Sequence, residues 1–286
     1  MTQQPPDLPD WFPQLAEVAR RARESMLRSI GPALDQQRRA IEQLAARGAF
    51  DYLERMKPVL AKVGALLEAN TPPNWQGLEA GQFGQAIDVV SESGLCLVWS
   101  PPLDVVQRVI ASPSLNDRLA ILEAEAPAVL EDLDRLISES EATDVEGHAD
   151  ACTFASRAVA AARDGHFEAA QALAACGLGQ ILHVSFDYPL FGGLGKAHRD
   201  FKERDLERTG RVELKVAVLQ TCTAKSLTNI EKADPGGGFN RHATGHGTLS
   251  FFSTPNSLAG LILLVAWVRE LKWLADHHPE AFRERE

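Results

Sequence analysis

The sequence predicts an all-α protein, and three observations carry that prediction. Apolar residues recur at helical spacing through residues 11–67. Two alanine-rich stretches, 149–163 and 166–186, meet at an Asp-Gly pair, and alanine both favours helix and lets helix axes approach closely. The third observation is an apolar run, Leu258–Val268, which suits a buried core helix and is too short to span a bilayer.

The remaining elements follow from shorter patterns. Residues 95–99 are apolar but have no evident partner strand, so we expect a buried connection there. The charged stretch 196–211 carries both signs of charge and is expected to be a solvated helix. Further helices are expected where apolar residues show helical spacing or an apolar segment has helical length: 80–91, 103–111, 115–138 and 212–230.

Two changes in composition divide the chain into three expected domains. The first is a Pro- and Asn-containing loop at 70–75, and the second is an acidic patch at 139–146. The expected domains are an N-terminal helical arm at 1–70, a middle helical segment at 71–140 and a C-terminal helical bundle at 141–286.

Composition narrows the class of protein. Of the 286 residues, 45% are hydrophobic and 24% are charged, which is typical of a soluble globular protein. The net charge, 29 minus 39 or -10, argues against a general nucleic-acid coat but leaves room for a local basic site. The four cysteines are far apart, and the first residues do not resemble a secretory signal. We therefore expect free thiols, no membrane association and a cytoplasmic location.

The candidate site is the segment that precedes the apolar run. Arg241, His242 and His246 follow three glycines at 236–238, and on a helix they could face one pocket. A permanent cation beside an imidazole is the minimum equipment for handling a phosphate ester. A purely structural role at a helix start remains an alternative. In that case Arg241 would pack on Trp267 or bond a carbonyl, and His246 would satisfy a buried amide.

Metal and phosphate-loop chemistry fit this segment less well. His242 and His246 have the spacing of two zinc ligands on a helix, but no third ligand stands at motif spacing, so we expect no metal and no cofactor. The glycines at 236–238 lack a following Lys-Ser/Thr and a preceding strand. A flexible lid or linker is the better interpretation of them.

From about residue 144 onward the chain resembles the HEPN superfamily of small all-α domains, many of which are ribonucleases. Three stretches carry the resemblance: the alanine-rich DGHFEAAQALAA at 164–175, the Arg-x4-His motif from Arg241 to His246, and the long apolar helix that starts at Pro255-Asn256. Asn240 beside the motif adds to the likeness and is a candidate substrate-binding residue. Gly245 departs from the pattern, because glycine lowers helix propensity inside the motif.

The resemblance implies a metal-independent endoribonuclease of a toxin or phage-defence kind. His246 would take the proton of a ribose 2'-hydroxyl, Arg241 would steady the scissile phosphate, and His242 would supply a second proton-transfer group. The products would be a 2',3'-cyclic phosphate and a 5'-hydroxyl. The expected partners are RNA, a second copy in a homodimer, and an antitoxin or regulatory protein. The competing hypothesis is a non-catalytic scaffold whose degenerate HEPN-like domain only dimerises or binds a nucleotide.

Overall fold

The computed structural model describes residues 71–140, 145, 147–185, 214–227 and 236–277. The chain divides into two compact units, one formed by residues 1–71 and 212–214 and the other by 72–211 and 215–286. Nearly all described residues belong to the second unit. The helices expected within 11–67 and the charged stretch at 196–211 lie outside the described residues.

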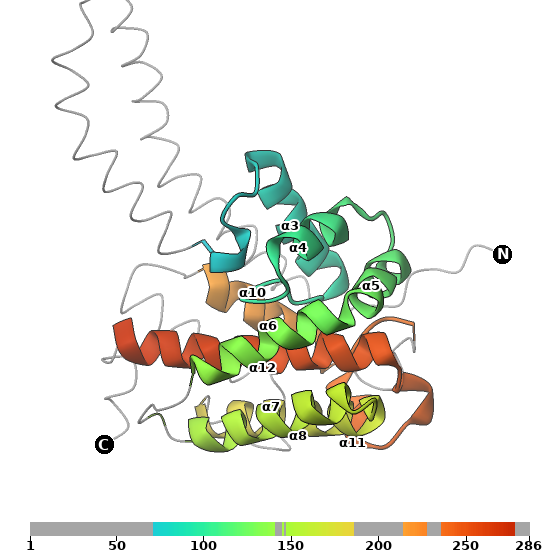
Figure 1. Cartoon of the computed structure of the whole chain (residues 1–286), viewed down its shortest axis with the longest axis vertical. Helices are drawn as coiled ribbons and strands as arrows, with labels where there is room; N and C mark the ends of the chain where they lie inside the picture. Colours follow the sequence, from blue (N-terminus) through green and yellow to red (C-terminus); the bar gives the residue numbers. More distant parts are fainter. Residues whose placement is uncertain (1–70, 141–144, 146, 186–213, 228–235, 278–286) are drawn as a thin grey trace, which may run out of the picture. The chain divides into compact units, whose positions relative to one another are not determined.

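The described residues form helices and contain no strand, so the expected all-α fold is confirmed (Figure 1). The expected helix at 103–111 has the same bounds in the structure, and those expected at 80–91, 149–163 and 166–186 begin and end within two residues of the observed ones. In chain order the elements are η1 (Pro73–Trp75), α3 (Ala80–Ser93), α4 (Leu103–Ala111), α5 (Leu115–Ala124), α6 (Ala126–Ser138), α7 (His148–Arg163), α8 (Phe167–Ser185), α10 (Leu214–Ser226), α11 (Arg241–Gly245), η3 (Leu249–Phe251) and α12 (Thr254–His277).

The prediction of one helix over 115–138 is wrong. The structure has two helices, because Pro127 is the second residue of α6. A proline inside a continuous helix would lose a backbone hydrogen bond, and its ring would clash with the carbonyl of Glu123 four residues earlier. The chain therefore ends α5 at Ala124 and starts α6 at Ala126.

Helix α12 is the centre of the fold. Every residue from Asn256 to Val268 is buried, as a helix that is apolar around its whole circumference must be. It packs against α5, α6, α7 and α8, and Figure 1 shows it running alongside the α7–α8 hairpin. Helices from both sides of residue 140 thus cover the same central helix. None of the described helices is long and apolar enough to cross a membrane.

The burial of α12 bears on the expected homodimer. The run Leu258–Val268 was the reason to expect that a second copy would cover exposed apolar surface. Each residue of this run is at most 6% exposed within one chain. The apolar run therefore gives no reason for dimerisation, and the homodimer stays a prediction.

The connection between α3 and α4 is buried, as expected. Leu95 to Trp99 form no regular element, and each is at most 5% exposed. The Nδ2 of Asn74 donates to the carbonyl of Leu97 at 2.9 Å, and the indole of Trp75 donates to the same oxygen at 2.6 Å. These side chains replace the partner strand that an extended apolar segment otherwise needs.

Candidate functional site

Residues 240–247, which we call the histidine segment, begin with a short, capped helix, α11. Asn240 is the N-cap of α11, and its Oδ1 accepts the N–H of Ala243 at 2.8 Å. Gly238 before the helix and Gly247 after it have positive φ angles of 91° and 67°, a backbone conformation that favours glycine. Asn240 is 5% exposed. The structure thus gives the candidate substrate-binding residue a capping role.

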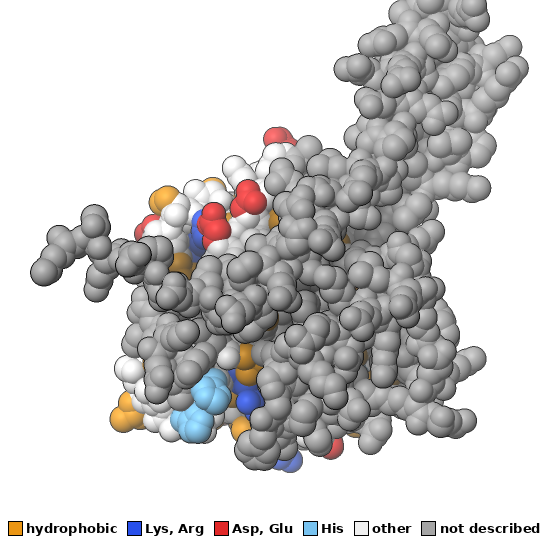
Figure 2. All heavy atoms as spheres, turned by 180° about the vertical axis from the view of Figure 1, so that it is seen from behind, with side chains coloured by type: hydrophobic (Ala, Val, Ile, Leu, Met, Phe, Trp, Pro, Cys, Tyr) orange, Lys and Arg blue, Asp and Glu red, His pale blue; other side chains and the backbone are white. Residues whose placement is uncertain are grey.

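The two imidazoles of α11 lie against each other at the surface. The His242 and His246 ring centroids are 4.7 Å apart with an interplanar angle of 73°. One helical turn separates them, and the N–H of His246 donates to the carbonyl of His242 at 3.1 Å. His242 is half-buried and His246 is exposed. Figure 2 shows histidine side chains gathered at the surface beside basic ones, where the turned view places α11.

Burial and charge act on the His242 imidazole. Partial burial, then the neighbouring His246, then Arg241 together lower the pKa of His242 below its ordinary value. A lowered pKa keeps this ring neutral at neutral pH, so that it can accept a proton or a hydrogen bond. Arg241 therefore acts on His242 through its charge.

Arg241 itself lies against α8. Its Nε donates to the carbonyl of Ala175 at 3.2 Å, and its guanidinium contacts the backbone at Gly179. Of the three side chains expected to face one pocket, the two histidines contact each other at the surface, whereas Arg241 bonds to α8. The alternative of a carbonyl bond for Arg241 is realised, whereas His246 is exposed and does not serve a buried amide.

A buried amide holds α11 in place. Gln171 of α8 is 0% exposed, and its Nε2 donates to Thr244 Oγ1 at 2.8 Å and to the Phe251 carbonyl at 3.0 Å. Its Oε1 accepts from Ser257 Oγ at 3.2 Å and from the Ser253 N–H at 3.5 Å. One side chain thus links α8, α11, η3 and α12.

Two further hydrogen bonds complete this network. Thr244 Oγ1 donates to the Asn240 carbonyl at 2.8 Å, and Asn256 Nδ2 donates to the Phe251 carbonyl at 3.0 Å. A satisfied polar network in a low-dielectric interior specifies one geometry, because each unmade bond would be costly. The histidine segment is therefore held rigidly at its inner side while its imidazoles reach the surface.

A second polar cluster surrounds Glu270 and Lys215, and sequence reasoning missed it. Glu270 is 0% exposed, accepts the indole N–H of Trp99 at 2.7 Å, and lies 4.0 Å from the Lys215 Nζ. The same Nζ lies 3.3 Å from the Trp273 ring centroid. The only local signal is a glutamate two residues beyond the apolar run. Because Glu270 and Lys215 are both buried, this ion pair belongs to the interior of the fold and is not placed to meet a substrate.

Cys152 and His148 are close, but their geometry does not suit proton transfer. The Cys152 Sγ lies 3.5 Å from Nδ1 and 3.9 Å from Nε2 of His148. Two such similar distances place the sulfur over the ring and away from the in-plane lone pair of Nδ1. The His148 Nε2 lies 3.0 Å from the Val268 carbonyl, so this nitrogen carries the proton. Within the described residues no group of three or more His, Cys, Asp or Glu could hold a metal ion.

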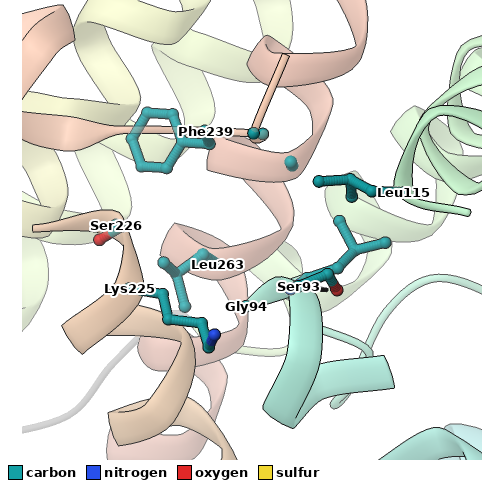
Figure 3. A pocket seen from close by; sticks show the side chains of 11 residues that line it. Ser93, Gly94, Leu115, Lys225, Ser226, Phe239 and Leu263 are labelled. Carbon is teal, nitrogen blue, oxygen red and sulfur yellow. Dashed lines mark hydrogen bonds between the residues drawn. The ribbon is translucent and has the colours of Figure 1, made fainter. Parts of the chain in front are cut away.

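A pocket lies next to the segment but contains neither histidine. The pocket is open to the solvent and lies between α3, α5, α10, α12 and residues 237–239. Figure 3 shows Phe239, Leu115 and Leu263 around it. Lys225 Nζ donates to the Glu92 carbonyl at 3.0 Å, and Ser226 Oγ donates to the Thr223 carbonyl at 2.7 Å. Its polar side chains are thus engaged with the backbone, and the pocket suggests no ligand class.

No protein-family model, curated protein or solved structure matches this chain. The HEPN resemblance therefore stays a prediction.

Proposed function

We propose that the chain is a metal-independent endoribonuclease whose site is formed by Arg241, His242 and His246. The observation that carries the proposal is the contact between the two imidazoles, 4.7 Å apart at the surface, on a helix held by a buried polar network. Cleavage of RNA by its own 2'-hydroxyl needs a proton acceptor, a proton donor and a cation for the phosphorane. These three groups supply that chemistry without a metal.

Each group has one role in this proposal. His246 is exposed and takes the proton of the ribose 2'-hydroxyl. His242, whose ring contacts His246, accepts this proton from His246 and gives it to the 5'-oxygen as the bond between that oxygen and phosphorus breaks. Arg241 balances the charge that develops on the phosphate, because its guanidinium cannot lose its proton. The products are a 2',3'-cyclic phosphate and a 5'-hydroxyl.

The biological setting belongs to the same proposal. A site whose imidazoles lie at the surface suits an exposed RNA strand, and an antitoxin or regulatory protein that covers α11 would silence it. A homodimer would bring two copies of the motif together. Sedimentation at tens of micromolar tests the assembly, and a monomer there would remove it from the proposal.

A non-catalytic scaffold is the second candidate, and the position of Arg241 favours it. The bond from Nε to the Ala175 carbonyl ties α11 to α8, as a structural arginine would. If this tie were its whole role, Arg241→Lys would lower the melting temperature and would change no RNA-dependent property.

Rate measurements on four proteins separate the candidates. Wild type, His242→Ala, His246→Ala and the control His166→Ala are compared on a mixed RNA pool in EDTA. His166 is exposed and lies at the start of α8, away from α11 in sequence. Loss of acid–base assistance should lower the rate by about 10²- to 10⁴-fold in His246→Ala. The control should cleave like wild type, and equal rates in all four would exclude the proposed roles.

A further inference from the structure

Gly179 of α8 lies directly beneath the Arg241 guanidinium. A Cβ built on Gly179 would collide with Arg241 Nη2 and would lie 3.2 Å from Cζ and 3.4 Å from Nε. Three atoms of one planar group are thus in contact range, so the guanidinium lies close against the α8 backbone. Only glycine leaves room for this arrangement.

Two other glycines in helices, Gly177 and Gly81, do not lie against a charged side chain. A Cβ on Gly177, also in α8, would lie 2.8 Å from Phe154 Cβ and 2.9 Å from a Leu264 methyl carbon, so that glycine serves core packing. A Cβ on Gly81 of α3 would meet nothing within 4 Å. Gly179, itself buried, instead makes room for the end of the half-buried Arg241 side chain where α8 meets α11. Glycine weakens a helix, but at position 179 the absence of a Cβ leaves the space that the Arg241 guanidinium occupies.

The contact with Gly179 leaves the two Nη groups of Arg241 without a bonded acceptor among the described residues. Arginine has five N–H donors in a planar fork. Within the described residues, the Ala175 carbonyl is the one acceptor bonded to it, and that bond uses Nε. The two Nη groups form the edge that matches two oxygens of a phosphate.

We propose that Gly179 is a positioning residue that holds the Arg241 guanidinium so that its Nη edge binds a phosphodiester. This inference rests on the proposed function for the identity of the anion. It adds that phosphate binding depends on a residue of α8, which carries no charge and touches no substrate. In Gly179→Ala the guanidinium must move while the rest of the fold stays in place, because the clashing atoms end a flexible side chain.

A double-mutant cycle tests this role. The probe is a short fluorescent 2'-deoxy oligonucleotide, which cannot form a cyclic phosphate and therefore reports binding alone. Gly179→Ala should raise its dissociation constant about tenfold, a coupling typical of residues in contact. The melting temperature should not fall, because alanine is the better helix former. The control Gly81→Ala should bind like wild type.

Arg241→Ala supplies the other side of the cycle. Because Gly179 acts through Arg241, adding Gly179→Ala to Arg241→Ala should change the dissociation constant no further. The inference is overturned if Gly179→Ala binds like wild type, if its effect persists without Arg241, or if the wild type does not bind the probe.

Failure of this inference is distinguishable from failure of the proposed function. If the Gly179–Arg241 coupling is observed but the protein cleaves no RNA, the positioning role of Gly179 stands and the proposed ribonuclease function fails. If the protein cleaves RNA equally well with Gly179→Ala, the ribonuclease function stands and the positioning role of Gly179 fails.

Discussion

Replacing Gln171 by leucine should destabilise the protein and release the histidine segment. Leucine has a similar volume, so the change removes hydrogen bonds with little loss of packing. Three partners keep another bond: Phe251 O still accepts from Asn256, Thr244 still donates to Asn240, and Ser257 Oγ still donates to a backbone carbonyl. The Ser253 N–H keeps no such bond, but its contact with Gln171 is long, at 3.5 Å.

The magnitude follows from the two bonds that the Gln171 amide donates, because the single hydroxyl proton of Ser257 has backbone carbonyls at 2.8 Å. At a net value of about 1 kcal/mol each, their loss lowers the free energy of unfolding by about 2 kcal/mol. For a chain of this size that corresponds to a fall in melting temperature of roughly 4–8 °C. Gln85 of α3 is exposed, so the control Gln85→Leu should change stability by less than about 0.5 kcal/mol.

Chemical denaturation measures the stability, and amide hydrogen exchange measures the release. The substitution Gln171→Leu should increase the exchange rates of the backbone amides of residues 240–247 more than those of α4. No residue of α4 takes part in the hydrogen bonds of Gln171 described above. A variant as stable as wild type would refute the idea that the buried amide organises α11. A general loss of stability without faster exchange at 240–247 would refute its local role.

Three further predictions concern the rest of the fold. Glu270→Ala leaves Lys215 and the Trp99 indole buried without their carboxylate and should cost about 3–5 kcal/mol in denaturant unfolding, whereas Asp276→Ala, which breaks an exposed pair with Lys272, should cost less than about 1 kcal/mol. Burial, with a smaller contribution from Lys272, lowers the pKa of His148, so that as the pH falls the unfolded chain takes up the His148 proton before the folded chain does. The free energy of unfolding should therefore fall as the pH drops below about 6.5, and it should fall less in His148→Asn if this ring is the cause. Thiol titration of the native protein should find Cys176 fast and Cys96 and Cys222 slow, because burial and the Cys96 contact raise the pKa of Cys222 well above its ordinary value; all 4 cysteines should react after denaturation without reductant, and fewer would indicate a disulfide.

Local patterns were sufficient for most helices and for the histidine pair. Leu258–Val268 is buried as its uniform apolarity predicts, and the His242–His246 contact follows from residues four apart on a helix. The break before Pro127 could have been predicted, because proline excludes a continuous helix there.

The inner side of the site could not be predicted in this way. Gln171 contacts Thr244 across 73 residues of sequence, and Arg241 meets Ala175 across 66. No periodicity or motif links residues so far apart in the sequence. Nothing in the alanine-rich pattern of α8 indicates that Gln171 bonds to three other elements. The role proposed for Gly179 could not be predicted from the sequence either, because it depends on the Arg241 side chain that packs against it in the fold.

The chemistry of the new RNA ends shows whether the chain is a metal-independent endoribonuclease. Purified wild-type protein is incubated with a mixed RNA pool in EDTA, and the new ends are scored beside those made by His246→Ala. We expect 2',3'-cyclic phosphate and 5'-hydroxyl ends from the wild type, formed about 10²- to 10⁴-fold more slowly by the variant. The absence of wild-type cleavage, or cleavage that survives His246→Ala unchanged, would contradict the account.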